Sequence, residues 1–282
     1  MSWLLIDAGN TAVKWTTADA GGPADRVERL DNATPTFEAQ LAAAFAAAAA
    51  RAGSANRTTG LGTRDAASVA APRAPVAAAV GCCVASDAVR AAIERAVAVS
   101  GMALSWLQSQ AGHAPAPALV NRYRDYTQLG ADRWHAMLGA RGLHPGRALV
   151  VVHSGTATTI DCVSADGAFI GGAILPGTDL MLEALAWRTA QLPHARGAAV
   201  PFPDNTDDAI ATGIADAQAG AVERMVARFA RQAGSAVTVL LGGGAAAALH
   251  MRLQLDPTQA QLALAHNLVL RGLWRRARET AR

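Results

Sequence analysis

Three short loops in this chain of 282 residues carry the residue types that bind phosphate. They read DAGNT (Asp7–Thr11), SGTATT (Ser154–Thr159) and LGGGA (Leu241–Ala245). In each, an apolar run is followed by small or hydroxyl residues, so backbone N–H groups can come close to phosphate oxygens. Ordinary turns use the same residue types, so one loop alone would be weak evidence. Three of them in one chain favour a protein that binds a polyphosphate.

The first loop has the richest set of side chains. An apolar run before it and an apolar alternation after it predict a β-hairpin over Leu4–Trp15. At its tip, Asp7 could position hydrated Mg²⁺ and Lys14 could donate to phosphate oxygens. The candidate ATP- and phosphate-binding residues are Asp7, Ala8, Gly9, Asn10, Thr11, Ala12, Val13, Lys14, Thr156 and Gly243.

Strands and helices alternate around these loops, which is typical of α/β proteins. A helix is predicted over Phe37–Arg51, and a strand over Ala148–Val152 begins the second half on the same plan. The Pro- and Ala-rich segment Ala111–Val120 is predicted to be a linker. We therefore expect two domains, residues 1–115 and 116–282, hinged near this segment, with the C-terminal helix packing back on one of them.

Composition narrows the class of protein. The formal net charge is only +3, and the basic residues are scattered except in Arg271–Arg282, so no nucleic-acid partner is expected. No apolar run has the length and character of a membrane span, so no membrane partner is expected. Cys82, Cys83 and Cys162 form neither a metal-binding pattern nor a disulfide framework. We expect a soluble cytoplasmic protein with buried thiols, and an exposed loop over Gly53–Pro75.

Further motifs narrow the assignment. GADRW lies at Gly130–Trp134, GGAILPG at Gly171–Gly177 and NTDDAIATG at Asn205–Gly213. With the three loops, and in this order over nearly the whole chain, they resemble type III pantothenate kinase. That family belongs to the superfamily of actin, heat-shock chaperones and sugar kinases. The resemblance implies a two-domain actin-like ATPase fold of ribonuclease H-like type, with mixed sheets flanked by helices. No GxxxxGK[ST] motif is present, which disfavours the P-loop class.

The resemblance also implies an activity. It is the ATP-dependent phosphorylation of pantothenate to 4′-phosphopantothenate, the first step of coenzyme A biosynthesis, by a homodimer that uses Mg²⁺ and a monovalent cation, K⁺ or NH₄⁺. Two alternatives stay open. One is a non-catalytic regulatory protein that keeps the kinase fold, since a branch of the family was described as an accessory factor for virulence gene expression. The other is a kinase of another small-molecule hydroxyl group.

The resemblance assigns roles to the central motif. Asp132 is the proton acceptor; its alternative role is a negative charge at a helix N-terminus, where the helix dipole favours it. Arg133 binds the substrate carboxylate or neutralises phosphate; its alternative role is a surface ion pair. Tyr123 matches the tyrosine of the substrate pocket, and Thr206 matches a hydroxyl residue that reaches substrate; their alternative roles are a packed aromatic ring and a helix N-cap. The candidate substrate-binding residues are Tyr123, Gly130, Ala131, Asp132, Arg133 and Thr206.

The chain departs from the family pattern at two positions. His153 stands where many relatives have an Asp that binds the monovalent cation, and a neutral imidazole is a poor ligand for K⁺. We therefore expect K⁺ to bind weakly through other oxygens or to be dispensable. Tyr126 stands where relatives usually have Pro, which would loosen the loop before GADRW.

Two arrangements of the site residues are expected. Asp7, Thr156 and Gly243 should converge in a cleft between the two domains. In a two-fold homodimer with an interface that includes Met181–Trp187, Asp132 and Arg133 of one subunit should face Thr206 of the other.

Overall fold

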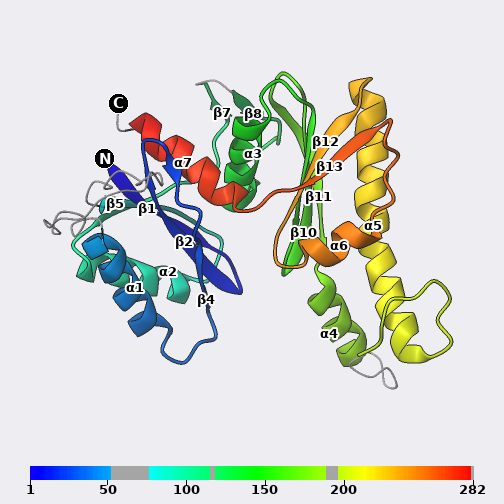
Figure 1. Cartoon of the computed structure of the whole chain (residues 1–282), viewed down its shortest axis with the longest axis horizontal. Coiled ribbons are helices and arrows are strands. Elements are labelled where there is room, and N and C mark those ends of the chain that lie inside the picture. The colour runs from blue at the N-terminus through cyan, green and yellow to red at the C-terminus, as the bar shows by residue number, and fades with distance from the viewer. Residues whose placement is uncertain (52–75, 115–117, 189–195, 281–282) are drawn as a thin grey trace, which may run out of the picture. The chain divides into compact units, whose positions relative to one another are not determined.

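The structure, a computed structural model, describes residues 1–51, 76–114, 118–188 and 196–280 (Figure 1). The predicted loop Gly53–Pro75 lies outside these ranges. The chain forms two compact units. The first unit comprises residues 1–108, 130–135 and 269–282, and the second comprises residues 109–129 and 136–268. The units therefore interleave along the chain, because two later segments return to the first unit.

The first unit is built on one mixed sheet with the order β3-β2-β1-β5-β6, and β4 pairs with β2. β1 runs antiparallel to β2 and parallel to β5, which confirms the predicted hairpin. Its elements are β1 (Ser2–Ala8), β2 (Ala12–Asp19), β3 (Gly22–Pro23), β4 (Glu28–Asp31), α1 (Phe37–Arg51), β5 (Val76–Cys83), α2 (Asp87–Val99), β6 (Ala103–Trp106), the start of α3 (Ala131–Leu143) and α7 (Leu268–Thr280).

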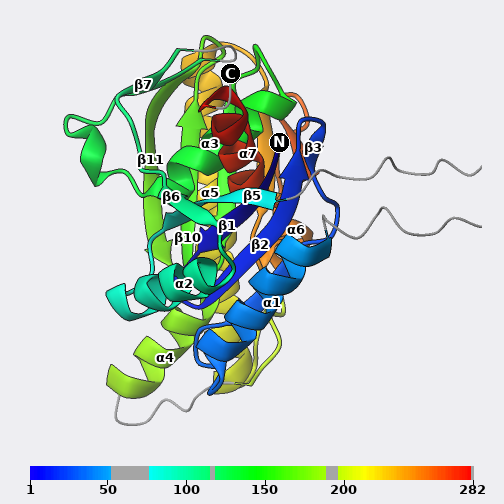
Figure 2. The ribbon, with the colours of Figure 1, turned by 90° about the vertical axis from the view of Figure 1, so that its left-hand side faces the viewer.

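Helices α1 and α2 lie side by side and supply the core of the first unit (Figure 2). Phe45 of α1 meets Trp15 of β2 edge to face, with 5.6 Å between the ring centroids. Ile93 of α2 and Ile6 of β1 are fully buried in the same cluster. The end of β1, which carries Asp7, is therefore held by a packed core.

The second unit is also built on one mixed sheet, with the order β13-β12-β9-β10-β11-β8-β7. Its elements are β7 (Gly112–His113), β8 (Leu119–Asn121), the short 3₁₀ helix η1 (Tyr126–Gln128), the rest of α3, β9 (Leu149–Ser154), β10 (Ala157–Val163), β11 (Ala168–Pro176), α4 (Thr178–Arg188), α5 (Thr206–Ala233), β12 (Val237–Gly242), α6 (Ala246–Arg252) and β13 (Ala260–Leu264).

The two sheets follow the same plan. In each, one strand pairs antiparallel with the strand that follows it in the chain, and two later strands add in parallel on its other side. In the first unit these strands are β1, β2, β5 and β6, and in the second they are β9, β10, β12 and β13. The α/β class with two mixed sheets flanked by helices, which was expected from the sequence, is confirmed.

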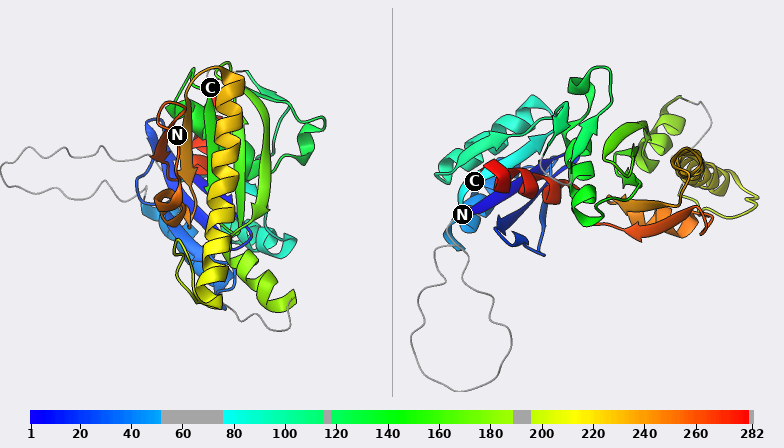
Figure 3. Two further views of the ribbon diagram at one scale, coloured as in Figure 1. Left: turned by 90° about the vertical axis from the view of Figure 1, so that its right-hand side faces the viewer. Right: turned by 90° about the horizontal axis from the view of Figure 1, so that it is seen from above.

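The long helix α5 covers one face of the second sheet (Figure 3). Val222, Val226 and Phe229 of α5 are buried against strands β9, β10 and β12. The other end of α5 packs against α4, where Ile210 and Ile214 form a smaller buried cluster. The N-terminal part of α5 thus extends beyond the main core and packs against α4.

The predicted linker Ala111–Val120 contains structure. Gly112–His113 pairs antiparallel with Leu119 and Val120 at the edge of the second sheet. Buried His113 and Leu119 supply the inward side chains. These strands are only two and three residues long, too short for an alternating pattern to reveal them. Within the described ranges, no helix has both the length and the apolar character that a bilayer span requires.

Candidate active site

The DAGNT turn joins β1 to β2, and the sheet fixes its geometry. Asp7 pairs with Lys14 across the hairpin and with Cys82 on the other side. The tip is closed by the Gly9 N–H, which donates to the Ala12 carbonyl at 3.1 Å. The backbone of the tip is thereby held in place, and its outermost side chains are exposed.

Asn32 locks this turn from the segment after β4. Its side-chain amide donates to the carbonyls of Gly9 and Asn10, both at 2.9 Å. Its backbone N–H donates to the Thr11 carbonyl at 2.8 Å. Sequence reasoning missed this residue, because an Asn in a turn-rich segment is the usual residue of an ordinary turn.

The Asp7 carboxylate lies in an unfavourable environment for a negative charge. Burial raises its pKa to about 6; Lys14 acts in the opposite direction and the charge of Asp132 in the same one. The pKa of the Cys82 thiol is raised well above its usual value by burial and by the same two carboxylates. A divalent cation favours oxygen ligands and would relieve this excess of negative charge, so the donor chemistry fits Mg²⁺. Asp7 and Asp132 thus form one electrostatic site within the first unit.

The GADRW motif forms the first turn of α3, and each residue type has a local reason. A Cβ at Gly130 would lie 2.6 Å from Oδ1 of Asp132, so a larger residue there would displace this carboxylate from its present position. That oxygen accepts the backbone N–H of Arg133 at 2.8 Å. Trp134 is fully buried and anchors the turn. Asp132 therefore lies at a helix N-terminus, the position that its alternative role requires. It is also close enough to Asp7 for its charge to raise the pKa of that carboxylate.

Arg133 is 6 % exposed. Its alternative role as a surface ion-pair partner is therefore wrong. A nearly buried guanidinium is costly unless it is paired, which suits an Arg that meets an anionic group.

The two loops of the second unit meet through their backbones. Ser154 accepts the Ala245 N–H at 3.1 Å, and the Gly177 N–H donates to the Thr156 carbonyl at 2.9 Å. Gly243 has φ +103°, and a Cβ there would collide with the backbone of Ser154. The second unit therefore brings the SGTATT and LGGGA loops together, with the Pro176–Gly177 end of β11 beside them. Sequence reasoning did not assign Ser154 or Gly177 to the site, since both act through main-chain atoms.

Two further predicted residues lie elsewhere in the second unit. The half-buried ring of Tyr123 packs against Phe169 of β11, with 5.1 Å between centroids. Thr206 is the exposed first residue of α5. Its alternative role as the N-cap is wrong, because the cap is Asn205, whose side chain accepts the Asp208 N–H at 2.9 Å.

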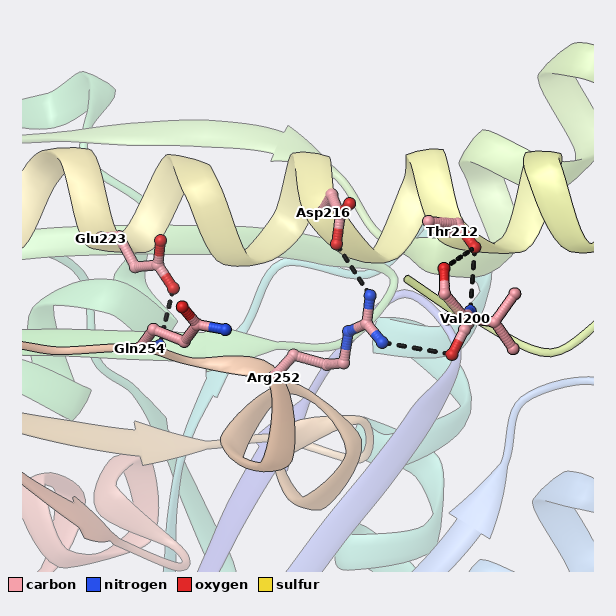
Figure 4. A network of polar contacts seen from close by, with 7 residues as sticks. Val200, Thr212, Asp216, Glu223, Arg252 and Gln254 are labelled. Atoms are coloured by element: carbon pink, nitrogen blue, oxygen red, sulfur yellow. Dashed lines mark hydrogen bonds and ion pairs between the residues drawn. The ribbon is translucent and has the colours of Figure 1, made fainter. Parts of the chain in front are cut away.

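Polar contacts hold the start of α5 and the segment before it (Figure 4). Arg252, the last residue of α6, donates to the Ala199 carbonyl at 3.2 Å and to Asp216 at 2.8 Å. Thr212 both accepts the Val200 N–H and donates to the Val200 carbonyl, each at 3.0 Å. The helix that follows the LGGGA loop is therefore connected to the helix that carries Thr206.

His153 is the penultimate residue of β9, paired with Thr159 of β10 and Gly242 of β12. It lies directly before Ser154, at the junction of the two loops. Among the described residues, no group of three or more His, Cys, Asp or Glu side chains could hold a metal ion.

Comparisons with known proteins give a consistent result. A family model for type III pantothenate kinase matches residues 3–228. A relative of that name from Aromatoleum aromaticum is 41% identical over 278 residues, which cover 99% of this chain and 98% of the relative. Another from a Janthinobacterium species is 39% identical and covers 96% and 95%, respectively. A solved structure described as a conserved putative Baf family transcriptional activator from Campylobacter jejuni has a TM-score of 0.54 at 17% identity, covering 99% of this chain and 98% of its own, and shares the fold.

Proposed function

The chain belongs to the type III pantothenate kinase family, and we propose that it transfers the terminal phosphoryl group of ATP to the primary hydroxyl of pantothenate. The products are 4′-phosphopantothenate and ADP, and the reaction is the first step of coenzyme A biosynthesis. The observation that carries the proposal is the electrostatic site of Asp7 and Asp132. It joins a carboxylate suited to Mg·ATP with one suited to proton transfer.

In this mechanism Asp132 accepts the proton of the pantothenate hydroxyl. The hydroxyl oxygen forms a bond to the terminal phosphorus atom, and the bond from that phosphorus to the bridging oxygen of ADP breaks. Phosphoryl transfer depends mainly on positioning and charge neutralisation. The fixed position of Asp132 at the start of α3 fits this requirement.

The nucleotide is bound by the turn Asp7–Lys14 together with Thr156 and Gly243. Its phosphates accept hydrogen bonds from backbone N–H groups and from Lys14. Mg²⁺ supplies charge neutralisation of the phosphates, and Asp7 would hold it through water or directly. The support for this role is the carboxylate chemistry of Asp7 and the backbone-built loops of the second unit.

Pantothenate is bound by the motif Gly130–Arg133 together with Tyr123 and Thr206. The Arg133 guanidinium pairs with the pantothenate carboxylate, for which Arg is well suited because it can donate two parallel hydrogen bonds. Tyr123 supplies an aromatic wall, already packed on Phe169. Thr206 is exposed in the single chain, which supports a role toward a partner subunit.

A two-fold homodimer would complete this substrate site. One face of helix α4 packs against α5 through Met181, Leu182 and Leu185. Trp187 is 78% exposed and, with Leu180, lines a groove of about 580 Å³. We expect a dimer in sedimentation, and we expect Trp187→Asp to give a monomer that turns over pantothenate poorly. A monomer with full activity would contradict this arrangement.

The monovalent cation is the part of the family pattern that this chain changes. With His153 in place of a carboxylate, K⁺ should bind weakly through main-chain and hydroxyl oxygens or be dispensable. Rates measured in KCl and NaCl at constant ionic strength separate a specific cation from screening. Strong, saturable activation by K⁺ that His153→Ala abolishes would refute this expectation.

A substrate panel tests the function itself. The purified protein, with ATP and Mg²⁺, should phosphorylate pantothenate in preference to sugars and acetate. Phosphorylation of another hydroxyl compound would point to a different kinase. Salt-sensitive DNA binding without any turnover would point to a regulatory protein. We also propose a cytoplasmic location, supported by the free thiols of Cys82, Cys83 and Cys162.

A further inference from the structure

We propose that Asn121 is a positioning residue for pantothenate, acting through the loop that carries Tyr123. This inference rests on the proposed function and deepens it. It concerns one buried amide side chain that the motifs do not include. Asn121 is the last residue of β8 and is 8% exposed.

Both ends of the Asn121 side chain are used within the loop that follows it. Its Oδ1 accepts the backbone N–H of Tyr123 at 3.1 Å, and its Nδ2 donates to the Tyr126 carbonyl at 3.3 Å. The Tyr126 carbonyl also accepts a hydrogen bond from Ser109 Oγ at 3.0 Å. One buried side chain thus fixes the loop at two points, and a second reinforces the far one.

The loop is exposed over most of its length. The six residues from Arg124 to Leu129 include five exposed ones, and only Leu129 is buried. Asp125 closes the local turn by accepting the Thr127 N–H at 2.9 Å, a contact within the loop itself. The hydrogen bonds of Asn121 therefore tie this exposed loop, and with it the Tyr123 backbone, to strand β8. Buried hydrogen bonds of this kind are costly to break, because the groups left behind lose their partners.

The position of the Tyr123 ring follows from this restraint. The ring contacts Phe169, so a shift of the Tyr123 backbone would change how the ring meets that residue. If Tyr123 lines the acceptor pocket, releasing the loop should weaken pantothenate binding and leave nucleotide binding unchanged. A purely structural role for Asn121 predicts no such selectivity.

The test compares Asn121→Ala with the wild-type protein, with the pantothenate and ATP concentrations varied independently. We expect KM for pantothenate to rise about tenfold, the effect of losing hydrogen bonds worth about 1.4 kcal/mol in total. KM for ATP should stay within about twofold. An unchanged KM for pantothenate, or equal changes in both KM values, would overturn the proposal.

Asn32→Ala is the matched control, because Asn32 holds the DAGNT turn with the same chemistry. It should raise KM for ATP and leave KM for pantothenate within about twofold. If both variants instead moved both constants together, the two side chains would be acting through general loosening of the protein, and the positioning role would be rejected.

A double-mutant cycle tests whether Asn121 acts through Tyr123. Tyr123→Ala removes the ring and keeps the backbone N–H that Asn121 binds. The double variant Asn121→Ala/Tyr123→Ala should therefore have the same KM for pantothenate as Tyr123→Ala, within about twofold. Multiplicative effects would show that Asn121 acts by another route.

Two measurements keep the outcome decisive. If Asn121→Ala does not fold, Ser109→Ala removes one donor to the Tyr126 carbonyl and keeps Asn121. It should raise KM for pantothenate about twofold to threefold, and no change would overturn the proposal. The wild-type assay comes first: no pantothenate turnover there would refute the proposed function, whereas turnover with an unaltered Asn121→Ala variant refutes only the positioning role.

Discussion

The DAGNT turn of the first unit and the SGTATT and LGGGA loops of the second unit, which we propose to bind the same nucleotide, are built in different ways. The turn relies on charged side chains: Asp7 lies opposite Lys14, and the charge of Asp132 raises the pKa of Asp7. The second-unit loops rely on main-chain contacts, such as that from the Ala245 N–H to the Ser154 carbonyl. Side-chain chemistry can be changed one atom at a time, whereas backbone packing tolerates almost no added volume.

This difference predicts how each region should respond to substitutions. Isosteric loss of a charge in the first unit should leave the fold intact and change the reaction or its pH dependence. A methyl group added where backbones of the second-unit loops touch, as at Gly243, should disturb the backbone itself and therefore both stability and nucleotide binding.

Asp132→Asn should have the largest effect. We expect kcat to fall by roughly 10²- to 10⁴-fold, the range for losing a positioned proton acceptor, with circular dichroism unchanged. Asp87→Asn is the matched control, because Asp87 is also an acidic residue in the first turn of a helix. It should change stability by less than about 1 kcal/mol and leave kcat unaltered. Near wild-type kcat in Asp132→Asn would leave only the helix-dipole role.

Gly243→Ala should have the next largest effect. The added Cβ would meet the Ser154 backbone in a residue with φ +103°, and such strain costs about 1–3 kcal/mol before any steric overlap. We expect a lower free energy of unfolding in urea and a KM for ATP raised by roughly tenfold or more. Gly244→Ala is the control, because a Cβ there meets nothing within 4 Å. Equal behaviour of the two variants would contradict the role of backbone packing.

The sequence could predict the first region better than the second. The apolar runs around Asp7 predicted the hairpin correctly, and Asp132 lies at a helix N-terminus, as its alternative role requires. Contacts made by main-chain atoms leave no side-chain signature, so the roles of Ser154 and Gly177 stayed hidden. Asn32 and Asn121 were missed for a related reason, because Asn is common in turns whatever it binds.

The loop before GADRW shows the same limit. The absence of Pro at Tyr126 suggested a looser loop. In the structure its carbonyl is held by Ser109 and Asn121, which lie 17 and 5 residues away in the sequence. Restraints of this range depend on the fold and cannot be seen in a local pattern. The interleaving of the two units, with the start of α3 in the first, arises in the same way.

Asp7→Asn should separate stability from activity. The pKa of Asp7 is about 6 in the folded protein and 3.8 in the unfolded chain, where the carboxyl group is solvated. The folded state therefore binds the proton more tightly. Its contribution favours folding below pH 3.8 and is lost as the pH rises toward 6. At pH 7 the ionised carboxylate therefore costs at most about 3 kcal/mol. We expect Asp7→Asn to raise the free energy of unfolding at pH 7, with a smaller gain at pH 5.

The activity of the same variant should move in the opposite direction. Without the carboxylate, Mg·ATP should be used less well, and a higher Mg²⁺ concentration should be needed. In the wild-type protein, KM for Mg·ATP should rise as the pH falls below about 6, where Asp7 gains a proton. A variant that is less stable at pH 7, or a wild-type KM that does not change with pH, would contradict this role of Asp7.

The smallest effect is expected where charges only hold a segment in place. Asp216 and Arg252 form an ion pair at 2.8 Å, with side chains 65% and 30% exposed. An ion pair this exposed is worth a few tenths of a kcal/mol and is screened by salt. Asp216→Asn should therefore lower the free energy of unfolding by less than about 0.5 kcal/mol, and 0.5 M NaCl should erase the difference.

Arg252→Ala should cost more, about 1 kcal/mol, because it also removes the donor to the Ala199 carbonyl and the packing of the long side chain. That part should survive in 0.5 M NaCl, so the salt dependence separates the ion pair from the hydrogen bond. If Asp216→Asn instead lowered kcat as strongly as Asp132→Asn, charge in the second unit would take part in the reaction. The contrast between a charged first-unit turn and backbone-built second-unit loops would then fail.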